Sequence, residues 1–337
     1  MERLGVAFLG ELAPPDFVGC MQLAEELGYE SAWMAEGRAG DQFSILTAAA
    51  LRTSRILLGT SITSVFVRTP STLGMAAATV DHFSNGRFVL GVGSDHKAQV
   101  GPMHSGVYAN PMGRLKETVE VVRQLWATGD IHYSGEVLDI ELYPLWFEPL
   151  RKEIPIYVAA VQPKMLALAG EISSGALSTW HTVDHARNAR GYVNDGAARA
   201  GKRPDQVDLA QMIPCYVCED GDKARRYMKH RVAFKAFMLP RYRQRMEEAG
   251  YTEEVAAVKD AYAEGKVDYA ASLVPDGLAE SFGLVGTPEE AREQVKRWRE
   301  AGVTLPMLSL RTPPGIPMTR QEGIALFNEC IRACAPS

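Results

Sequence analysis

The chain has 337 residues, of which 46% are hydrophobic and 23% are charged, and its formal net charge is −5. These values are typical of a globular protein that buries a large core. The acidic balance and the lack of a long basic run argue against a nucleic-acid-binding protein and give no signal for binding to a membrane surface.

The N-terminal segment carries no targeting signal that we recognise. A short apolar run ends before Glu11, and no basic stretch precedes it, so we expect no signal peptide. No part of the sequence approaches the roughly 18 apolar residues of a membrane-spanning helix. The five cysteines are sparse and odd in number, which is typical of reduced thiols. We therefore expect a cytoplasmic protein.

Strands and helices are predicted to alternate along the chain. Apolar runs predict strands at residues 4–9, 31–35, 55–59, 87–93, 154–160, 175–179, 207–218 and 305–310. Helical patterns follow at residues 16–28, 42–52, 71–83, 112–127, 163–171, 186–200, 287–302 and 319–334. Parallel strands that are buried on both faces read as continuous apolar runs, so the sequence predicts an α/β fold, a (β/α)8 TIM barrel.

A doubly wound sheet is the alternative fold. It would normally show a glycine-rich dinucleotide loop after the first strand, and residues 10–15 (GELAPP) are not such a loop. We therefore expect residues 1–337 to form a single barrel domain with two insertions. One is a hairpin near residues 129–145, and the other is mostly helical and lies near residues 220–285. Residues 97–111 are expected to be a long loop.

The segment at residues 55–71, RILLGTSITSVFVRTPS, predicts where the chemistry takes place. After the strand at residues 55–59 comes a row of small and hydroxyl-bearing residues, which lets a planar ring approach the main chain closely. Pro70 then opens a helix at a position where a missing N–H costs little. In a barrel, active sites lie where strands end and helices begin. We call Ser61, Ile62 and Thr63 the ledge.

The residues at the other strand ends should converge on the same mouth, and several of them are charged or aromatic. They are Glu11, Glu36, Ser94, Asp95, His96, Ala159, Ala160, Trp180, His181 and Arg311. Glu36, His96 and Glu11 are our acid–base candidates, because a carboxylate in an apolar mouth can have a raised pKa that suits proton transfer. Each also has a structural interpretation. Glu36 could cap the second helix or pair with Arg38, His96 could be a solvated loop residue, and Glu11 could be an ordinary loop carboxylate.

Residues 161–165 (VQPKM) predict an anion site. They join a strand to a helix whose first N–H groups are free to bind a phosphate, and Lys164 adds positive charge. A plain turn between strand and helix is the alternative interpretation.

Other motifs do not predict a site. Cys215 and Cys218 have CxxC spacing but lie in a strand pattern without a second pair, and His181 and His185 fall in a loop, so we expect no metal. Neither a P-loop nor a G-x-S-x-G nucleophile motif occurs. Polar groups without a nucleophile or a metal site suggest that an organic cofactor supplies the chemistry.

Five segments resemble the bacterial-luciferase-like superfamily of flavin and deazaflavin oxidoreductases. Within it, the chain is most similar to the coenzyme F420-dependent branch that includes methylenetetrahydromethanopterin reductase. The segments are residues 23–36 (LAEELGYESAWMAE), 58–70 (LGTSITSVFVRTP), 86–103 (GRFVLGVGSDHKAQVGPM), 154–177 (IPIYVAAVQPKMLALAGEISSGAL) and 284–303 (LVGTPEEAREQVKRWREAGV).

The resemblance implies a (β/α)8 barrel with a bulge after the third strand, which often carries a non-prolyl cis peptide and backs the central ring of the cofactor. It also implies that the cofactor phosphate lies at the start of the fifth helix, and that the protein is a homodimer or a higher homo-oligomer. The residues expected to bind cofactor are Ser61, Ile62, Thr63, Gly93, Ser94, Ala159, Ala160, Gln162, Pro163, Lys164, Met165 and Trp180.

Three positions depart from the family pattern. Many members carry Asp-His after the second strand, where this chain has Glu36-Gly37. Many deazaflavin-dependent dehydrogenases carry a glutamate after the fourth strand, where this chain has residues 94–96 (SDH). The usual glycine before Pro163 is Gln162. The departures fit a cofactor site and leave the substrate and the proton donor open.

The resemblance leads us to expect an oxidoreductase that transfers a hydride between C5 of coenzyme F420 and a small organic substrate. One alternative is an FMN-dependent monooxygenase that activates O₂ with reduced flavin. A further alternative is a barrel that binds flavin or another ligand without turnover. Cofactor preference and oxygen uptake distinguish the two enzymes, and binding without redox chemistry would indicate the third.

Overall fold

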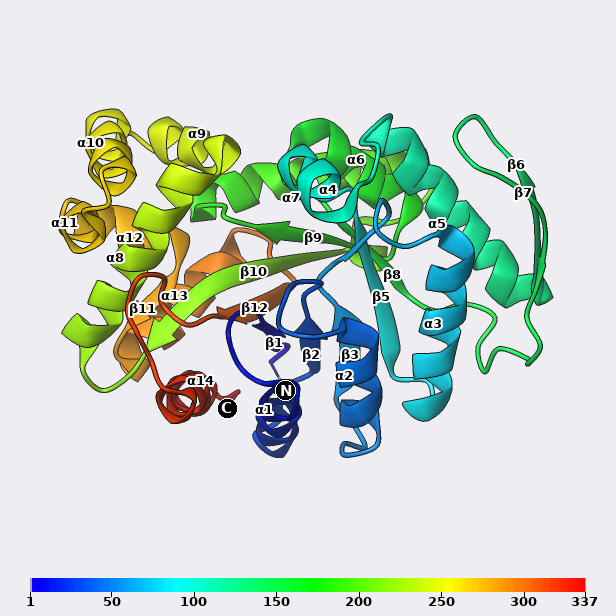
Figure 1. Cartoon of the computed structure of the whole chain (residues 1–337), viewed down its shortest axis with the longest axis horizontal. Helices are drawn as coiled ribbons and strands as arrows, with labels where there is room; N and C mark the ends of the chain where they lie inside the picture. The colour runs from blue at the N-terminus through cyan, green and yellow to red at the C-terminus, as the bar shows by residue number, and fades with distance from the viewer. Residues whose placement is uncertain (1, 337) are drawn as a thin grey trace.

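The computed structural model describes residues 2–336, and its centre is a closed barrel of parallel strands (Figure 1). Within these residues, eight strands form the ring. In order around the barrel they are β1 (Gly5–Phe8), β2 (Ser31–Met34), β3 (Leu57–Thr60), β5 (Phe88–Gly93), β8 (Ile156–Ala159), β9 (Gly175–Thr179), β10 (Asp208–Val217) and β12 (Leu305–Leu310). Pairing of β12 with β1 closes the ring. The predicted TIM barrel is therefore confirmed.

Helices form the outer layer of the barrel. They are α1 (Pro14–Glu26), α2 (Gln42–Ala50), α3 (Pro70–Phe83), α5 (Pro111–Thr128), α6 (Pro163–Ile172), α7 (Val183–Arg199), α13 (Pro288–Glu300) and α14 (Arg320–Ala333). A short 3₁₀ helix spans Pro204–Gln206. Capping by nearby side chains explains where several of these helices begin. Thr69 caps α3 directly before Pro70, and Thr287 and Glu290 form a capping box on α13.

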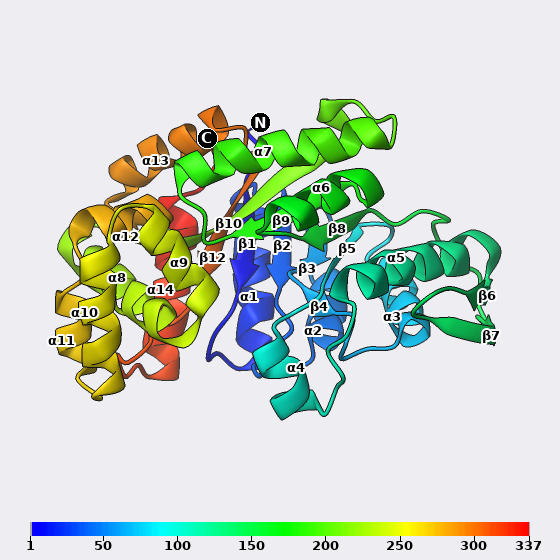
Figure 2. The same ribbon diagram turned by 90° about the horizontal axis from the view of Figure 1, so that it is seen from above.

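Two additions lie at opposite edges of the molecule (Figure 2). The strands β6 (Asp130–Ser134) and β7 (Asp139–Pro144) pair antiparallel as a hairpin beyond α5. At the other edge, the chain between β10 and α13 forms a helical group, which contains α8 (Gly221–Met238), α9 (Pro240–Glu248), α10 (Thr252–Ala263), α11 (Val267–Ser272), α12 (Asp276–Phe282) and the short strand β11 (Leu284–Gly286). The strand β11 pairs with β10 and extends the sheet locally.

The predicted loop at residues 97–111 is wrong in part, because it contains the helix α4 (Lys97–His104). Its glycine and proline content predicted a loop, and Pro102 does lie inside the helix. The helix is held at its centre by Val100, which is fully buried. It ends at Ser105, which takes the left-handed conformation with φ of 54°. Tertiary burial here outweighs the local preference.

The inside of the barrel is a small cluster of its own. Its members come from strands all around the ring and contact one another: Ala7, Trp33, Val89, Tyr157, Leu177, Ala210, Met212, Leu305 and Met307. Trp33 is the largest, and its indole N–H donates to Ser31 Oγ at 2.8 Å. A Cβ on Gly59 would lie 2.2 Å from the Trp33 ring. The Trp33 ring therefore fits inside the barrel only because residue 59 is a glycine.

No helix within residues 2–336 is both long and apolar enough to cross a membrane. The same residues contain no group of three or more His, Cys, Asp or Glu side chains placed to hold a metal ion.

The lower end of the barrel, where the strands begin, is closed by Asp208 at the start of β10. Its carboxylate accepts hydrogen bonds from Arg3 at 2.7 Å and from the Thr304 hydroxyl at 2.7 Å, and also from the Tyr157 hydroxyl. Burial alone would raise the pKa of Asp208, but these hydrogen bonds outweigh it and hold the pKa below its usual value. The ionised carboxylate thus ties β1, β8 and β10 together.

We expect Asp208→Asn to lower the free energy of unfolding at pH 7 by about 1–3 kcal/mol, because the charged acceptor is lost. A depressed pKa in the folded state stabilises the protein above the unfolded-state pKa of about 4 and stops doing so as the pH falls through the folded value. The difference between the two proteins should therefore shrink near pH 3. Urea unfolding at both pH values measures it, with the exposed Asp205→Asn as control. An equal deficit at both pH values would contradict the charge-based explanation.

Candidate active site

The ledge lies where predicted, at the upper end of the barrel directly after β3. The Ser61–Ile62 peptide bond is cis, and the next two residues form β4 (Thr63–Ser64), which pairs with β5. The backbone N–H of Ser61 donates to the Met34 carbonyl at 2.8 Å. The Ile62 side chain is half-buried and packs on the barrel interior. The bulge that the resemblance implied is thus present.

Glu36, at the end of β2, fixes the ledge from behind. One carboxylate oxygen accepts from the Thr63 hydroxyl at 2.9 Å and from the Ser64 N–H at 2.8 Å. The other accepts from Arg68 Nε at 2.8 Å. Arg68 also pairs with Asp41. Both carboxylate oxygens therefore accept hydrogen bonds, one from the ledge and one from Arg68, and the role of Glu36 in proton transfer stays a prediction.

The structural interpretations of Glu36 made from the sequence are both wrong. Its ion-pair partner is Arg68 rather than Arg38, and α2 is capped by Asp41, whose side chain accepts from the Ser44 N–H. The loop after β3 folds back over the end of β2, so a residue 32 positions away is closer than one two positions away.

Gly93, at the end of β5, packs closely against the side chains of Ala159 and Ile62. A Cβ on Gly93 would lie 2.8 Å from the Ala159 Cβ and 2.9 Å from Ile62 Cδ1. The predicted cofactor residues Ile62, Gly93 and Ala159 thus come from three neighbouring strand ends and form one surface. Ser94 follows and is partly buried.

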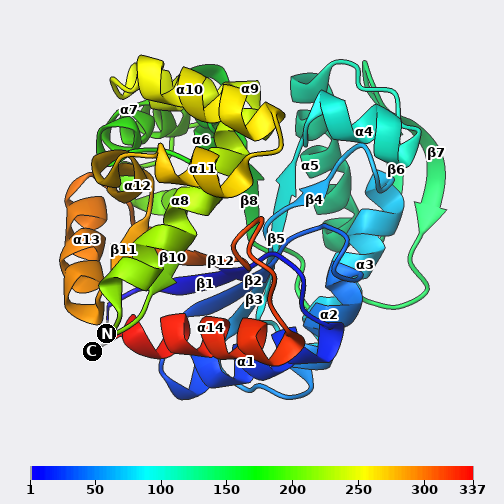
Figure 3. The same ribbon diagram turned by 60° about the vertical axis from the view of Figure 1, so that its left-hand side comes forward.

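His96 faces the helical group across the mouth. It precedes α4, and its ring meets the edge of Tyr242 on α9 with 6.1 Å between centroids. Figure 3 shows α4 and α9 on opposite sides of the strand ends. Burial lowers the pKa of His96 below 6.5, and the charges of Lys235 and Arg241 lower it further against the opposing effect of Asp95. His96 is therefore neutral at pH 7 and can accept a proton.

Trp180 is buried beside the mouth, whereas Glu11 is exposed to solvent. Trp180 follows β9 with φ of 53° and is only 3% exposed, because it packs between Tyr242 and Phe282 at 5.8 and 5.9 Å. Glu11 is exposed in the loop after β1.

The predicted anion site opens into a cavity of about 190 Å³ at the start of α6. Its lining includes Val161, Gln162, Pro163, Leu166, His181, His185, Asn188, Ala189, Tyr192, Arg245 and Glu248. The Gln162 side chain does not cap α6, so the first N–H groups of the helix are left for another acceptor. Of the predicted residues, Gln162 and Pro163 line the cavity, while Ala160 is buried, Met165 is partly buried and Lys164 is exposed beside it.

Two residues of this cavity, Arg245 and His181, are described by their charge and hydrogen bonds. Arg245 of α9 donates to the Val161 carbonyl at 2.6 Å and lies 3.4 Å from the Glu248 carboxylate. His181 is buried, and its Nδ1 finds no hydrogen-bond partner among the described residues. Burial, with the nearby charge of Arg245, lowers the pKa of His181 to about 3. The cavity lining thus includes the Arg245 guanidinium, the Glu248 carboxylate that lies beside it, and a neutral imidazole that has an unused nitrogen.

The residues that the sequence did not predict come mainly from the helical group: Arg231, Lys235, Tyr242 and Arg245. Nothing in the linear pattern places α8 and α9 over the mouth. The signal that could have found the first two is their spacing of four residues on one helix, which puts them on the same face.

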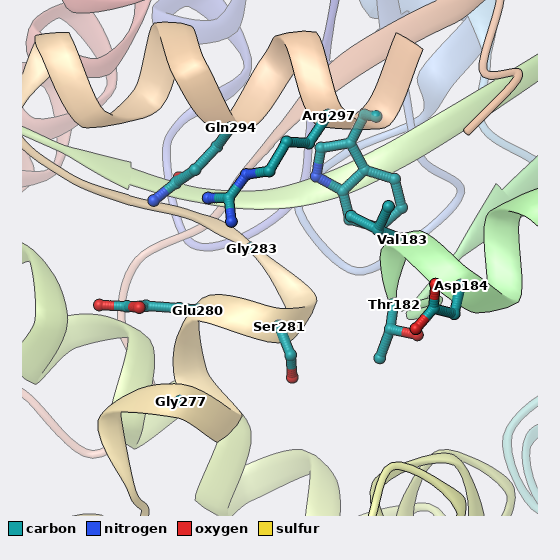
Figure 4. A pocket seen from close by; sticks show the side chains of 10 residues that line it. Thr182, Val183, Asp184, Gly277, Glu280, Ser281, Gly283, Gln294 and Arg297 are labelled. Atoms are coloured by element: carbon teal, nitrogen blue, oxygen red, sulfur yellow. The ribbon is translucent and has the colours of Figure 1, made fainter. Parts of the chain in front are cut away.

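A larger cavity of about 290 Å³ lies away from the mouth (Figure 4). It is bounded by the start of α7, by α12 and by α13, with Glu280 and Arg297 among its lining residues. Its lining includes none of the predicted cofactor residues, so we do not consider it the active site.

Comparison with known proteins agrees with the geometry. Residues 4–305 match the family model of the luciferase-like monooxygenases. The chain belongs to the luciferase-like family. This confirms the family that the sequence predicted, and it makes the chain an oxidoreductase of that family.

Several proteins similar to this chain carry the names of F420-dependent enzymes. The 5,10-methylenetetrahydromethanopterin reductase of Archaeoglobus fulgidus is 30% identical over 309 residues, which cover 90% of this chain and 91% of the relative. A Mycobacterium tuberculosis protein with the provisional name coenzyme F420-dependent oxidoreductase Rv3520c is 30% identical over 326 residues, with coverage of 90% and 92%. The solved coenzyme F420-dependent tetrahydromethanopterin reductase of Methanopyrus kandleri superposes with a TM-score of 0.86 at 26% identity, with both chains fully covered.

Substitution of Gly93 tests how the ledge is supported. We expect Gly93→Ala to lower the unfolding free energy by about 1–3 kcal/mol, because the new methyl group must displace Ile62 or Ala159. Gly37→Ala is the control, since a Cβ there meets nothing within 4 Å. Thermal unfolding of both variants measures the difference. Equal melting temperatures would show that the ledge tolerates movement at this point.

Proposed function

We propose that this luciferase-like protein transfers a hydride between coenzyme F420 and a small organic substrate at the mouth of the barrel. The observation that carries the proposal is the juxtaposition of two predicted features, the ledge after β3 and the anion cavity at the start of α6, at the same end of one barrel. A deazaflavin with a phosphate-bearing tail needs both a flat apolar support and an anion site. The names of the similar proteins support the same cofactor.

The residues present fit this cofactor. The Ser61 hydroxyl on the ledge is buried without a partner among the described residues, and so is His181 Nδ1 beside the cavity. Buried polar groups are nearly always hydrogen-bonded. A bound ligand could supply the missing hydrogen-bond partners of Ser61 Oγ and His181 Nδ1. Ile62, Gly93 and Ala159 would support the ring, and Arg245 with the start of α6 would hold the phosphate.

Bound F420 would supply a two-electron hydride acceptor or donor at C5. The protein's part is to orient, to exclude water and to move a proton. The ledge fixes the plane of the ring, and Glu36 and Arg68 fix the ledge. Tyr242 and Trp180 enclose the mouth. His96 is the best placed of the three acid–base candidates, because it is neutral, partly buried and unpaired with a carboxylate other than its neighbour Asp95 within the described chain.

The homo-oligomeric state and the cytoplasmic location remain predictions from the sequence. An FMN-dependent monooxygenase on the same barrel stays the alternative function. It differs in the cofactor it binds and in the consumption of oxygen, and the first experiment below separates the two.

We expect the purified protein to bind F420 at least tenfold more tightly than FMN in a fluorescence titration. Arg245→Met should weaken F420 binding roughly 10- to 100-fold, since a charge-assisted contact contributes about 1.5–3 kcal/mol. It should leave unchanged the binding of 8-hydroxy-5-deazariboflavin, which lacks the anionic tail. Arg243→Met on the same helix is the matched control. A preference for FMN would favour the monooxygenase, and binding of neither would overturn the proposal.

His96→Gln should lower turnover by roughly 10²- to 10⁴-fold with F420 affinity unchanged, as expected for a lost proton acceptor. In the direction of substrate oxidation, kcat/KM of the wild type should fall as the pH drops through the lowered pKa of His96, below 6.5. This fall of kcat/KM at low pH, the acidic limb of the profile, should be absent in His96→Gln. Glu11→Gln and Glu36→Gln are compared under the same conditions, using the substrate that a screen with F420 identifies. Loss of the limb in either of these variants alone would move the role to that residue.

A further inference from the structure

Three cationic side chains meet at the mouth of the barrel: Arg231 and Lys235 of α8, and Arg311 directly after β12. We call them the mouth cations. Among residues 2–336, no carboxylate is found within ion-pair distance of any of the three, although the chain pairs many of its other arginines. Arg231 and Arg311 instead act on Lys235 as like charges. Such a cluster is electrostatically unfavourable by itself.

The mouth cations stand over the barrel interior. Along β12, Leu305 and Met307 face inward, and Ser309 and Arg311 continue the same alternation. Arg231 reaches in from α8 and donates to the Ser309 carbonyl at 2.7 Å and to the Ser309 hydroxyl at 2.9 Å. The guanidinium of Arg311 lies 5.2 Å from the Phe234 ring on the same helix. The cluster therefore lies above β10 and β12.

Burial of the mouth cations without a carboxylate partner is energetically unfavourable, because the charged groups lose their hydration. Arg231 is only 2% exposed. Its guanidinium lies 5.8 Å from the Tyr216 ring, and its Nε atom forms no hydrogen bond of good geometry among the described residues. The ammonium of Lys235 lies 5.6 Å from the Trp180 ring and 5.1 Å from the Tyr242 ring. Aromatic faces offset part of the lost hydration, but they do not neutralise three charges. A buried donor that lacks an acceptor indicates a ligand that supplies one.

The mouth cations are separate from the ledge, and of the predicted cofactor residues they contact Trp180 through Lys235. The ledge follows β3 and abuts β5, and the anion cavity follows β8. Arg231 and Arg311 lie above β10 and β12, and Lys235 lies beside Trp180 after β9. In the ring order, β1 and β2 separate the ledge from the cations on one side. On the other side the end of β9 borders both groups, because Trp180 contacts Lys235 and His181 lines the anion cavity. A molecule that stacks on a ring supported by the ledge would therefore present its far end to the cations.

We infer that the mouth cations bind an anionic group of the substrate, a carboxylate or a phosphate, so that the enzyme acts on small organic anions. The inference rests on the proposed function, because it assigns the ledge side of the mouth to the cofactor.

Sulfate is the probe for the mouth cations, and dimethyl sulfone is its neutral counterpart of similar shape. We expect sulfate, and not the sulfone, to bind the F420-loaded wild type in calorimetry. Lys235→Met and Arg311→Gln should each weaken sulfate binding at least tenfold. Lys223→Met, an exposed lysine at the start of the same helix, is the matched control and should leave it unchanged. Arg231 is left intact because it is buried.

The pH dependence gives a second readout that does not rely on a variant. Burial, together with Arg231 and Arg311, lowers the pKa of Lys235 to about 7. The other charged groups that face this region are Arg241 on α9, and Asp95 and His96 before α4. Sulfate keeps its charge between pH 6 and pH 8, and the anion is bound by the protonated lysine. Its affinity for the wild type should therefore fall roughly tenfold over that range, and this dependence should vanish in Lys235→Met.

Titration with F420 and with 8-hydroxy-5-deazariboflavin separates the substrate from the cofactor tail. If the mouth cations serve the substrate, Lys235→Met and Arg311→Gln bind both deazaflavins as tightly as the wild type. Selective loss of F420 binding would assign the cluster to the cofactor tail and overturn the inference. Unchanged sulfate affinity in both variants would overturn it while leaving the proposed function intact. Sulfate binding by a wild type that does not bind F420 would overturn the assignment to a hydride-transfer substrate and the proposed function together.

Discussion

The carboxylate of Glu36 is the interaction on which the upper end of the barrel depends. The chain leaves β3, makes the cis peptide at Ser61–Ile62 and returns to pair with β5 as β4. Such an irregular segment has few ladder hydrogen bonds of its own, so its polar groups must be satisfied from elsewhere. Glu36 satisfies the Ser64 N–H and the Thr63 hydroxyl, and it holds Arg68. The ledge can then present Ile62 toward the mouth without exposing unpaired backbone.

Charge at the mouth is divided between two places. At the start of α6, Arg245 is partly balanced by Glu248, and the neighbouring histidines are pushed toward their neutral forms. Above β10 and β12, the mouth cations have no acid partner in the described part of the chain. The chain is acidic as a whole, with a net charge of −5. The positive side chains in its central opening are therefore opposite in sign to the net charge of the chain.

The barrel and the helical group contribute different parts of the site. The strand ends supply the ledge, Gly93, Ala159 and the backbone of the anion cavity. The helices α8 and α9 supply Lys235, Tyr242 and Arg245, which close over these strand ends. A barrel positions a cofactor with its rigid strand ends, and the segments inserted between strands set the shape and charge of the space above it. In this chain, the segment between β10 and α13 supplies much of the surface above the strand ends.

The sequence alone determined the barrel, because its strands are continuous apolar runs and its helices carry local start signals such as Thr69-Pro70 and Thr287-Pro288. It also located the ledge, because that bulge is one contiguous segment, and it predicted an anion site at residues 161–165, which line part of a cavity. Only the tertiary structure decided that Glu36 pairs with Arg68, that residues 97–104 are a helix, and that Arg231 and Lys235 lie beside Arg311. The physical reason is the range of the interactions. Patterns of hydrophobicity and capping act over a few residues, whereas Ser309 and Arg231 are 78 positions apart in the sequence and meet only because α8 packs across the end of β12.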